Sequence, residues 1–381
     1  MRGLGVVALL LAAVAQPGAA RAESGDIVVG VSIGTTGPAA ALGIPERNAL
    51  EFVPKQIGGF AIKTIVLDDG GDAAAATANA RRLVGEARAD ILIGSSTTAP
   101  ALAIAAIAQE AGIPHFSLAP LPFTPQIAKW SVAMPPPVPL VGEVLYLHMK
   151  AHHVRTVGYL GFADGYGDQW YADLKAQGVP LGFSIVNDER FSRSDTSVAA
   201  QAAKLVVAHP DAILVGASGT AAAMPQIGLR DAGYKGLIYQ THGAAVADFI
   251  RIAGAAADGV VMASGPVMDP EGQPDSAPTK KPGLMLNEAY ESKYGPNSRS
   301  AFAGYASDVF VVLKRVVPVA LQTAKPGTAE FRDAVRAALL TEREIAASQG
   351  VYNFTATDRF GLDARARILL TVKDGKFVAA E

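Results

Sequence analysis

The sequence contains no cysteine among its 381 residues. Disulfides and thiolate metal sites are therefore excluded, and the N-terminal region offers no acceptor for a bacterial lipid anchor. Stability must come from apolar burial, for which 50% hydrophobic residues are sufficient. Because the chain is longer than the roughly 250 to 300 residues at which a single core stops growing, two domains are expected.

An excess of charge of one sign is also missing. The chain has 33 basic and 35 acidic residues, and its densest basic run is Lys280-Lys281. Nucleic-acid binding requires a clustered basic face, so no nucleic-acid partner is expected. The composition favours a small-molecule ligand and leaves a protein partner open.

No apolar run reaches the roughly 20 residues that cross a bilayer. The nearest is the uncharged stretch from Gly3 to Ala15, which follows Met1-Arg2 and precedes the A-x-A pattern Ala20-Arg21-Ala22. This is the layout of a secretory signal peptide. We predict a signal peptide over residues 1–22, cleaved near Ala22, and a soluble protein exported to the periplasm.

The motifs of common α/β enzymes are absent. Gly30, Gly34 and Gly37 do not have the G-x-G-x-x-G spacing of a dinucleotide site. The segment from Gly216 to Thr220 lacks the second glycine of the G-x-S-x-G nucleophile elbow. We therefore expect no enzyme activity and no cofactor.

Metal motifs are incomplete as well. His148 and His152 are four residues apart, but Met149 replaces the glutamate of H-E-x-x-H. The segment from Asp68 to Asp72 does not have calcium-loop spacing, and Asp72 is more simply a helix N-cap. No metal site is predicted.

From residue 26 onward, short Val- and Ile-rich runs alternate with segments of helical periodicity. This alternation predicts parallel sheets with helices on both faces. In the first half, strands are predicted at 27–33, 62–67, 90–94 and 114–118, and helices at 46–56, 73–87 and 98–111. After the proline cluster of residues 134–139, strands are predicted at 156–162, 181–187, 211–216, 236–240 and 259–264, with helices between them. The fold class is α/β with two doubly wound lobes.

The last third of the chain departs from this alternation. Three successive helices are predicted at 284–294, 300–324 (interrupted by Pro318) and 329–340, followed by strands within 351–379 joined at Gly361 and Asp374-Gly375. Helices without intervening strands cannot extend the second sheet, so they are expected to return to the first. The predicted N-terminal lobe is 23–136 plus 268–363, and the C-terminal lobe is 137–267 plus 364–381. Several crossings form a hinge that opens and closes a cleft.

The loop after the strand at 90–94 carries the clearest ligand-binding signal. It reads Ser95-Ser96-Thr97-Thr98-Ala99-Pro100 and leads into a helix. A helix start presents unpaired N–H groups, so hydroxyls there can hold a carboxylate. Ordinary N-capping by Ser or Thr is the alternative. Other candidate binding residues at strand ends are Ser117, Ala119, Tyr166, Ser218 and His242.

Several motifs occur in the order found in one known family. They include Thr36-Gly37-Pro38-Ala39, Asp68-Asp69, the Ser95–Pro100 loop, Ala111-Gly112-Ile113-Pro114, Tyr166-Gly167-Asp168, Leu229-Arg230-Asp231-Ala232-Gly233 and Gly304-Tyr305-Ala306-Ser307-Asp308. The chain resembles the type I periplasmic substrate-binding proteins of branched-chain amino acid and related ABC transporters, over essentially its whole mature length. The resemblance implies a monomer that delivers its ligand to permease subunits in the inner membrane.

The same resemblance implies roles for particular residues. Ser95–Thr97 and the Ser117–Ala119 turn correspond to the side that holds the ligand carboxylate, and Tyr166 to the opposing lobe. Two positions depart from amino-acid binders: His242 stands where they have an ammonium-binding glutamate, and Leu121 where they have a threonine. An ammonium buried without an anionic partner is costly.

These departures favour a small carboxylate with an aromatic or other apolar body, since Thr-His-Gly is similar to an aromatic-acid subgroup. Phe123, Trp130, Tyr166 and Tyr305 could supply ring contacts, with core packing as the alternative, especially for Phe123 and Trp130. A branched-chain amino-acid binder of the same type and an exported sensor domain remain alternative functions.

Overall fold

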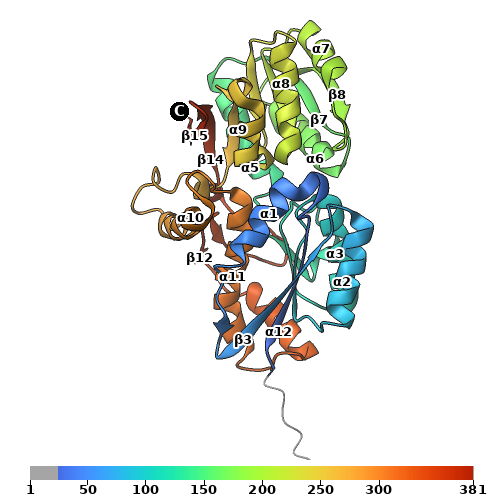
Figure 1. Cartoon of the computed structure of the whole chain (residues 1–381), viewed down its shortest axis with the longest axis vertical. Coiled ribbons are helices and arrows are strands. Elements are labelled where there is room, and N and C mark those ends of the chain that lie inside the picture. The colour runs from blue at the N-terminus through green and yellow to red at the C-terminus, as the bar shows by residue number, and fades with distance from the viewer. Residues whose placement is uncertain (1–24, 381) are drawn as a thin grey trace, which may run out of the picture.

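The computed structural model describes residues 25–380, so the predicted signal peptide lies outside the described residues. Two lobes are stacked along the long axis of the molecule (Figure 1). We call the part built on the six-stranded sheet the first lobe and the part built on the seven-stranded sheet the second lobe. The prediction of two mainly parallel α/β sheets is confirmed.

The first sheet has the strand order β2-β3-β1-β4-β5-β6. All neighbours are parallel except β2 and β3. Its strands are β1 (Ile27–Ile33), β2 (Gln56–Ile57), β3 (Phe60–Asp68), β4 (Ile91–Gly94), β5 (His115–Ser117) and β6 (Ser131–Ala133). Its helices are α1 (Ala40–Ala49), α2 (Ala73–Gly85), α3 (Thr98–Ala111) and α4 (Pro125–Ala128). Every residue of the central strand β4 is buried, as expected for a sheet covered on both faces.

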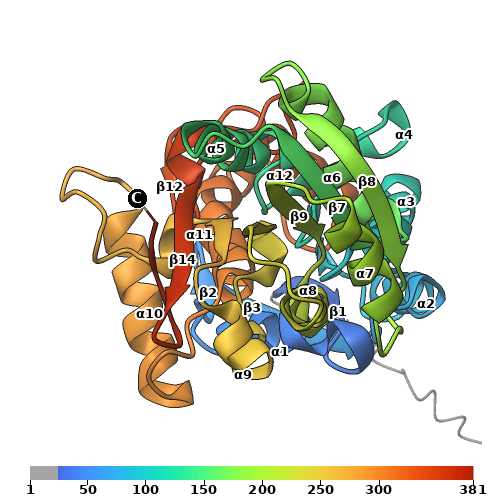
Figure 2. The same ribbon diagram turned by 90° about the horizontal axis from the view of Figure 1, so that it is seen from above.

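The second sheet has the order β15-β14-β11-β10-β9-β7-β8. Its strands are β7 (Thr156–Phe162), β8 (Ser184–Phe191), β9 (Ala212–Gly216), β10 (Leu237–Gln240), β11 (Val261–Ser264), β14 (Ile368–Lys373) and β15 (Lys376–Ala379). Its helices are α5 (Val138–Ala151), α6 (Gly165–Asp173), α7 (Ala199–Val207), α8 (Ala223–Asp231) and α9 (Ala247–Ala253), which surround the sheet when the molecule is viewed from above (Figure 2). The antiparallel pair β14 and β15 turns at Asp374-Gly375, as the sequence predicts.

The three late helices are α10 (Lys280–Tyr294), α11 (Ala301–Ala320) and α12 (Ala329–Leu339). Helix α11 packs against α12 and also against α1 and β2 of the first lobe. The late helices therefore return to the first lobe, as predicted. The short strands β12 (Ile345–Ala346) and β13 (Val351–Tyr352) follow. The chain therefore passes between the lobes three times, after β6, β11 and β13. Within residues 25–380, no helix is both long and apolar enough to span a bilayer.

Helix α1 is the clearest error of the sequence-based prediction. It begins at Ala40 and ends at Ala49, whereas a helix from Glu46 to Gln56 was expected. The true segment contains Gly43 and Pro45, which locally resemble a turn. A Cβ at Gly43 would lie 2.1 Å from the Gly34 carbonyl oxygen, so the helix position depends on a close backbone approach that local periodicity does not reveal.

Two details of the chain's last third were also wrong. Helix α11 continues through Pro318, which lies only two residues before its end. A proline there removes a hydrogen bond where the helix is about to stop, while burial along α11 holds the rest together. The strands on either side of Gly361 are joined by the long loop of residues 353–367, which contains one short 3₁₀ turn, Ala364–Ala366, and not by a tight turn at Gly361.

Candidate ligand-binding site

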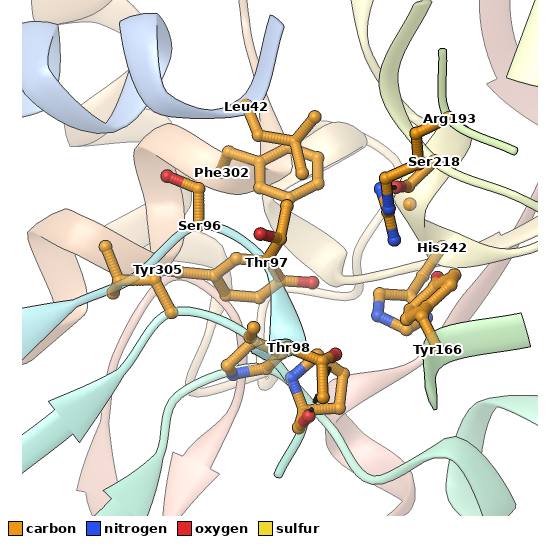
Figure 3. A pocket seen from close by; sticks show the side chains of 15 residues that line it. Leu42, Ser96, Thr97, Thr98, Tyr166, Arg193, Ser218, His242, Phe302 and Tyr305 are labelled. Atoms are coloured by element: carbon orange, nitrogen blue, oxygen red, sulfur yellow. Dashed lines mark hydrogen bonds between the residues drawn. The ribbon is translucent and has the colours of Figure 1, made fainter. Parts of the chain in front are cut away.

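A cavity lies where the two lobes face each other (Figure 3), enclosed by side chains of both lobes. Both lobes and helix α11 contribute side chains. The lining residues are Leu42, Ser96, Thr97, Thr98, Leu118, Ala119, Pro120 and Pro135 from the first lobe, Tyr166, Arg193, Ser218, His242 and Gly243 from the second, and Phe302 and Tyr305 from α11. No acidic residue is among them.

The first-lobe wall begins at the carboxyl end of β4. Thr97 is the N-cap residue of α3, with an extended backbone (φ −134°, ψ 157°), yet its side chain makes no capping hydrogen bond. Its hydroxyl is therefore not consumed by the helix and lies at the cavity wall. The N–H groups at the start of α3 add a partial positive charge to this wall.

The two serines that precede Thr97 are placed differently from each other. Ser96 lines the cavity, and its Oγ accepts a hydrogen bond from the Gly34 N–H at 3.1 Å and also contacts the Glu46 carboxyl. Ser95 is fully buried and does not line the cavity. Of this predicted pair, only Ser96 lines the cavity.

The turn after β5 is held by its own hydrogen bonds. Ser117 Oγ donates to the Ala119 carbonyl oxygen at 2.7 Å and accepts from the Ala119 N–H at 3.2 Å. Ala119 lines the cavity, whereas Ser117 does not. Ser117 therefore shapes the turn that presents Ala119.

The second-lobe wall includes the ring of Tyr166, at the start of α6. Asp164 caps this helix by accepting hydrogen bonds from the N–H groups of Tyr166 (2.9 Å) and Gly167 (3.2 Å). The Tyr166 hydroxyl donates to Thr241 Oγ1 at 2.9 Å. Burial raises the pKa of Tyr166 to about 12. Tyr166 is thus a neutral side chain whose hydroxyl is already bonded within the second lobe.

His242 lies beside Tyr166, with ring centroids 6.0 Å apart, and near Trp170, at 5.8 Å. It is 2% exposed, and burial lowers its pKa to about 4, so the ring is neutral at physiological pH. Its Nδ1 has no hydrogen-bond partner among the described residues. A buried polar atom without a partner is costly, and a ligand in the cavity can supply one.

Arg193 is a cavity-lining residue that sequence reasoning missed. Its Nε donates to Asp164 Oδ2 at 2.6 Å, and its Nη1 donates to Ser218 Oγ at 3.1 Å. The guanidinium carbon also lies 3.9 Å from the centre of the Phe162 ring. These contacts fix a planar cation at the cavity wall, which suits carboxylate recognition.

A signal for Arg193 does exist in the sequence. Strand β8 ends at Phe191, so Arg193 is two residues beyond the carboxyl end of a strand. The sequence-based strand stopped at Asn187, which placed Arg193 inside an uninterpreted loop. The same strand-end criterion that selected Ser95–Thr98 would have selected Arg193 if β8 had been drawn to its full length.

Helix α11 closes the cavity with Phe302 and Tyr305, whose rings meet edge to face at 5.7 Å. The Tyr305 hydroxyl is fully buried, has no partner in the described chain, and points into the cavity (Figure 3). The other two candidate aromatic residues lie elsewhere: Phe123 packs against Phe360 at 5.2 Å, and Trp130 lies beneath the Arg336 guanidinium. Tyr166 and Tyr305 are therefore the candidate ring contacts that the fold brings to the site.

Comparisons with known proteins place the chain in a family. A family model described as periplasmic binding protein matches residues 26–375. The chain belongs to the periplasmic binding protein family. Members of this family bind solutes and are not enzymes. No curated protein sequence matches the chain.

Solved structures agree with this assignment. An extracellular ligand-binding receptor from Rhodopseudomonas palustris HaA2 is 68% identical, with a TM-score of 0.93 over 93% of this chain and 100% of that one. The fold is shared with a leucine-binding protein from Thermotoga maritima (20% identity, TM-score 0.80, 93% and 98% covered). The fold is also shared with an ABC-transporter solute-binding protein from R. palustris in complex with benzoate. That protein has 20% sequence identity and a TM-score of 0.77, and the match covers 93% of this chain and 95% of that one.

The described part of the periplasmic binding protein holds no group of three or more His, Cys, Asp or Glu side chains placed to bind a metal ion. His148 on α5 and His152, the C-cap residue of that helix, stack with centroids 4.0 Å apart, and neither is among the cavity-lining residues. The polar side chains among the lining residues carry hydroxyls, a neutral imidazole and one guanidinium. This set can hold an anionic oxygen ligand and offers no carboxylate to an ammonium.

Proposed function

We propose that the protein is the periplasmic solute-binding component of an ABC importer and captures a small carboxylate with an aromatic or other apolar body. The observation that carries this proposal is the charge of the cavity wall. Arg193 is the one ionised side chain among the lining residues, and acidic side chains are missing from that set. A bound anion would be paired with the Arg193 guanidinium, whereas an α-ammonium would be buried without an anionic partner.

The remaining wall supports an apolar ligand body. The rings of Phe302, Tyr305 and Tyr166 and the side chains of Leu42 and Leu118 surround the cavity. Flat ligands pack favourably against such rings. A relative of the same fold was solved with benzoate, which is an acid of this kind. Family membership supports the export of the protein to the periplasm, with residues 1–22 as the proposed signal peptide, and delivery to permease subunits by a monomer.

The proposed binding mode joins the two lobes through the ligand. Arg193 and His242 belong to the second lobe, and Thr97 and the α3 N-terminus to the first, so one small anion can contact both walls at once. Such a ligand stabilises the closed arrangement because it gains contacts there that an open cleft would not offer. Closure would then report occupancy to the transporter.

A thermal-shift comparison tests the proposal. The protein lacking residues 1–22 is heated with benzoate, hexanoate, leucine, valine or benzamide, since a ligand that binds only the folded state raises the apparent unfolding temperature. The acids are expected to raise it, and the amino acids and benzamide to leave it nearly unchanged. A strong shift with leucine and none with either acid would reject the proposed ligand class. Recovery of chemically unchanged ligand after incubation checks that binding occurs without turnover.

A further inference from the structure

Glu46 is an ionisable side chain buried directly behind the cavity, and the proposed function does not yet use it. It lies on α1 with 0% of its surface exposed. Its Oε2 is hydrogen bonded to Ser96 Oγ, and its Oε1 has no partner among the described residues. Ser96 in turn lines the cavity. Glu46 is therefore one hydrogen bond away from any ligand that contacts Ser96.

The direction of the hydrogen bond between Glu46 and Ser96 decides what Ser96 can offer a ligand. A serine hydroxyl has one hydrogen to donate and two lone pairs to accept with. One lone pair is already used by the Gly34 N–H at 3.1 Å. If Glu46 is ionised, it can only accept, so it takes the single hydroxyl hydrogen of Ser96 and leaves none for an anion.

A neutral Glu46 reverses this arrangement. Its acid proton then donates to Ser96 Oγ, which fills the second lone pair. The hydroxyl hydrogen of Ser96 has no acceptor left behind the wall, so it is free to point into the cavity. The same serine is a hydrogen-bond donor to a bound carboxylate in one protonation state of Glu46 and not in the other.

The surroundings of Glu46 favour the neutral acid. Burial raises its pKa well above the usual range, the Ser96 hydrogen bond opposes that rise, and the charge of Asp69 adds to it. The titratable groups that face it are Asp69 beyond β3 and Tyr305 on α11, and neither is a cation. Arg47, its neighbour on α1, is exposed and bonds to Asn48. Within the described chain, no salt bridge involves Glu46.

We propose that Glu46 is a positioning residue for carboxylate recognition: as the neutral acid it donates to Ser96 Oγ and directs the hydroxyl hydrogen of Ser96 into the cavity. This inference rests on the proposed function, because it assumes an anionic ligand at the Ser96 wall. Loss of the proton from Glu46 would withdraw a donor and place a negative charge behind the anion. Binding of the carboxylate and retention of the proton on Glu46 are thus coupled.

The first test needs no ligand. Infrared difference spectra between the wild-type protein and Glu46→Gln are recorded at pH 7, where a neutral carboxyl shows a C=O stretch distinct from that of a carboxylate. A protonated-carboxyl band that is present in the wild type and missing in the variant supports the proposal. Absence of this band in the wild type would overturn it, whatever the protein binds.

The second test measures benzoate affinity by calorimetry from pH 5 to pH 10. Wild-type affinity is expected to fall by up to ~tenfold per pH unit above the pKa of Glu46, because each bound anion then requires uptake of one proton. Glu46→Gln is expected to lose this slope, since its amide always donates to Ser96. Glu51→Gln, an exposed glutamate beyond the same helix, should keep the wild-type profile. Identical profiles in wild type and Glu46→Gln, flat or sloping, would overturn the proposal.

Ser96→Ala separates a positioning role from simple electrostatics. Without the hydroxyl, the part of the pH slope that Glu46 exerts through Ser96 is expected to disappear, and a slope as steep as that of the wild type would contradict the proposal. Failure of the proposed function has a different signature: neither benzoate nor hexanoate binds the wild type at any pH. The infrared result then still decides the protonation of Glu46. Thermal unfolding of each variant confirms that it folds.

Discussion

The two walls of the cavity are built in different ways. The first-lobe wall comes largely from one contiguous loop, in which Ser96, Thr97 and Thr98 follow the end of β4. The second-lobe wall gathers Tyr166, Arg193, Ser218 and His242 from four separate loops. Hydrogen bonds within that lobe hold these side chains in place, from Arg193 to Asp164 and Ser218 and from Tyr166 to Thr241.

The walls also differ in charge. The first offers hydroxyls and the N–H groups at the start of α3, which are dipoles without formal charge. The second offers the Arg193 guanidinium, held in place before any ligand arrives. We infer a division of roles in which the first lobe orients a carboxylate and the second neutralises it. The predictions that follow test this division, beginning with the largest expected effect.

Removing the cation should have the greatest consequence. Arg193→Met keeps an unbranched apolar stem but deletes the guanidinium, and loss of one partner of a buried charge pair costs about 2 to 5 kcal/mol. Benzoate affinity measured by calorimetry is therefore expected to fall at least ~30-fold. Arg190→Met is the matched control, since Arg190 pairs with Asp188 and Asp168 outside the cavity lining. Equal losses in the two variants would contradict a specific role for Arg193.

Each lobe contains one buried neutral histidine, and both should make the protein sensitive to acid. Burial lowers the pKa of His115 and of His242 to about 4, whereas an unfolded chain titrates near ~6.5. Between these values the unfolded state binds more protons, so the free energy of unfolding falls as the pH drops from about 6.5 toward about 4. The loss between pH 6.5 and pH 5 is expected to be about 1 to 2 kcal/mol for each histidine.

Urea unfolding of His115→Asn and His242→Phe at pH 6.5 and pH 5 measures how much each histidine contributes to this loss of stability. Each variant should lose less stability on acidification than the wild type does. The two histidines should differ in ligand binding, because His115 is bonded through both ring nitrogens to Ser131 and Gly94, whereas His242 lines the cavity and its Nδ1 has no partner among the described residues. Only the His242 variant should weaken benzoate binding. An equal loss of benzoate affinity in the His115 variant would contradict the expected difference between the two histidines.

The first-lobe wall should show smaller effects, because its hydrogen bonds are neutral donors to an anion. Thr97→Val removes a hydroxyl that makes no capping bond, so α3 should remain intact. A hydrogen bond to a charged group contributes about 1.5 kcal/mol or somewhat more, which corresponds to a ~tenfold loss of benzoate affinity. Thr77→Val on α2, whose hydroxyl bonds to the Ala73 carbonyl oxygen away from the cavity, is the control. A loss as large as that of Arg193→Met would reverse the proposed roles of the lobes.

Tyr305 should give the smallest change. Tyr305→Phe keeps the ring that contacts Phe302 and deletes a hydroxyl without a partner in the described chain. Ligand-free stability should be equal or slightly higher, because an unsatisfied buried polar group is removed. For ligands that bond to this hydroxyl, affinity should fall by a few-fold. Lower ligand-free stability would show that the hydroxyl already has a partner.

The difference between the walls also explains how well each could be predicted. Ser96, Thr97 and Thr98 follow a short strand of Ile and Leu and precede an apolar helix with a proline in its first turn, so one local pattern indicates both their position and their candidate role. Asp72 is a similar case, because its predicted capping of α2 is observed as a 2.8 Å bond from the Ala75 N–H. The second-lobe residues have no shared pattern, and an error of four residues in the end of β8 concealed Arg193.

Local patterns also fail where a distant segment determines the structure. Helix α1 was misplaced because Gly43 and Pro45 look like turn residues until the close approach to Gly34 is known. The predicted roles of Ser95 and Ser117 assumed that every hydroxyl near the loop faces the ligand. In the fold, Ser95 is buried behind the wall and Ser117 bonds to its own turn. Which hydroxyls remain free depends on hydrogen-bond partners that sequence spacing does not specify.

The sequence by itself determined two mainly parallel α/β sheets, the return of the late helices to the first lobe, and a hydroxyl-rich helix start at a strand end. These follow from hydrophobic periodicity and chain connectivity, which are local. Only the tertiary structure decided that Arg193 meets Thr97 across one cavity and that Glu46 lies behind Ser96. Such contacts join segments far apart in the chain, and they are fixed by how the two lobes pack and close.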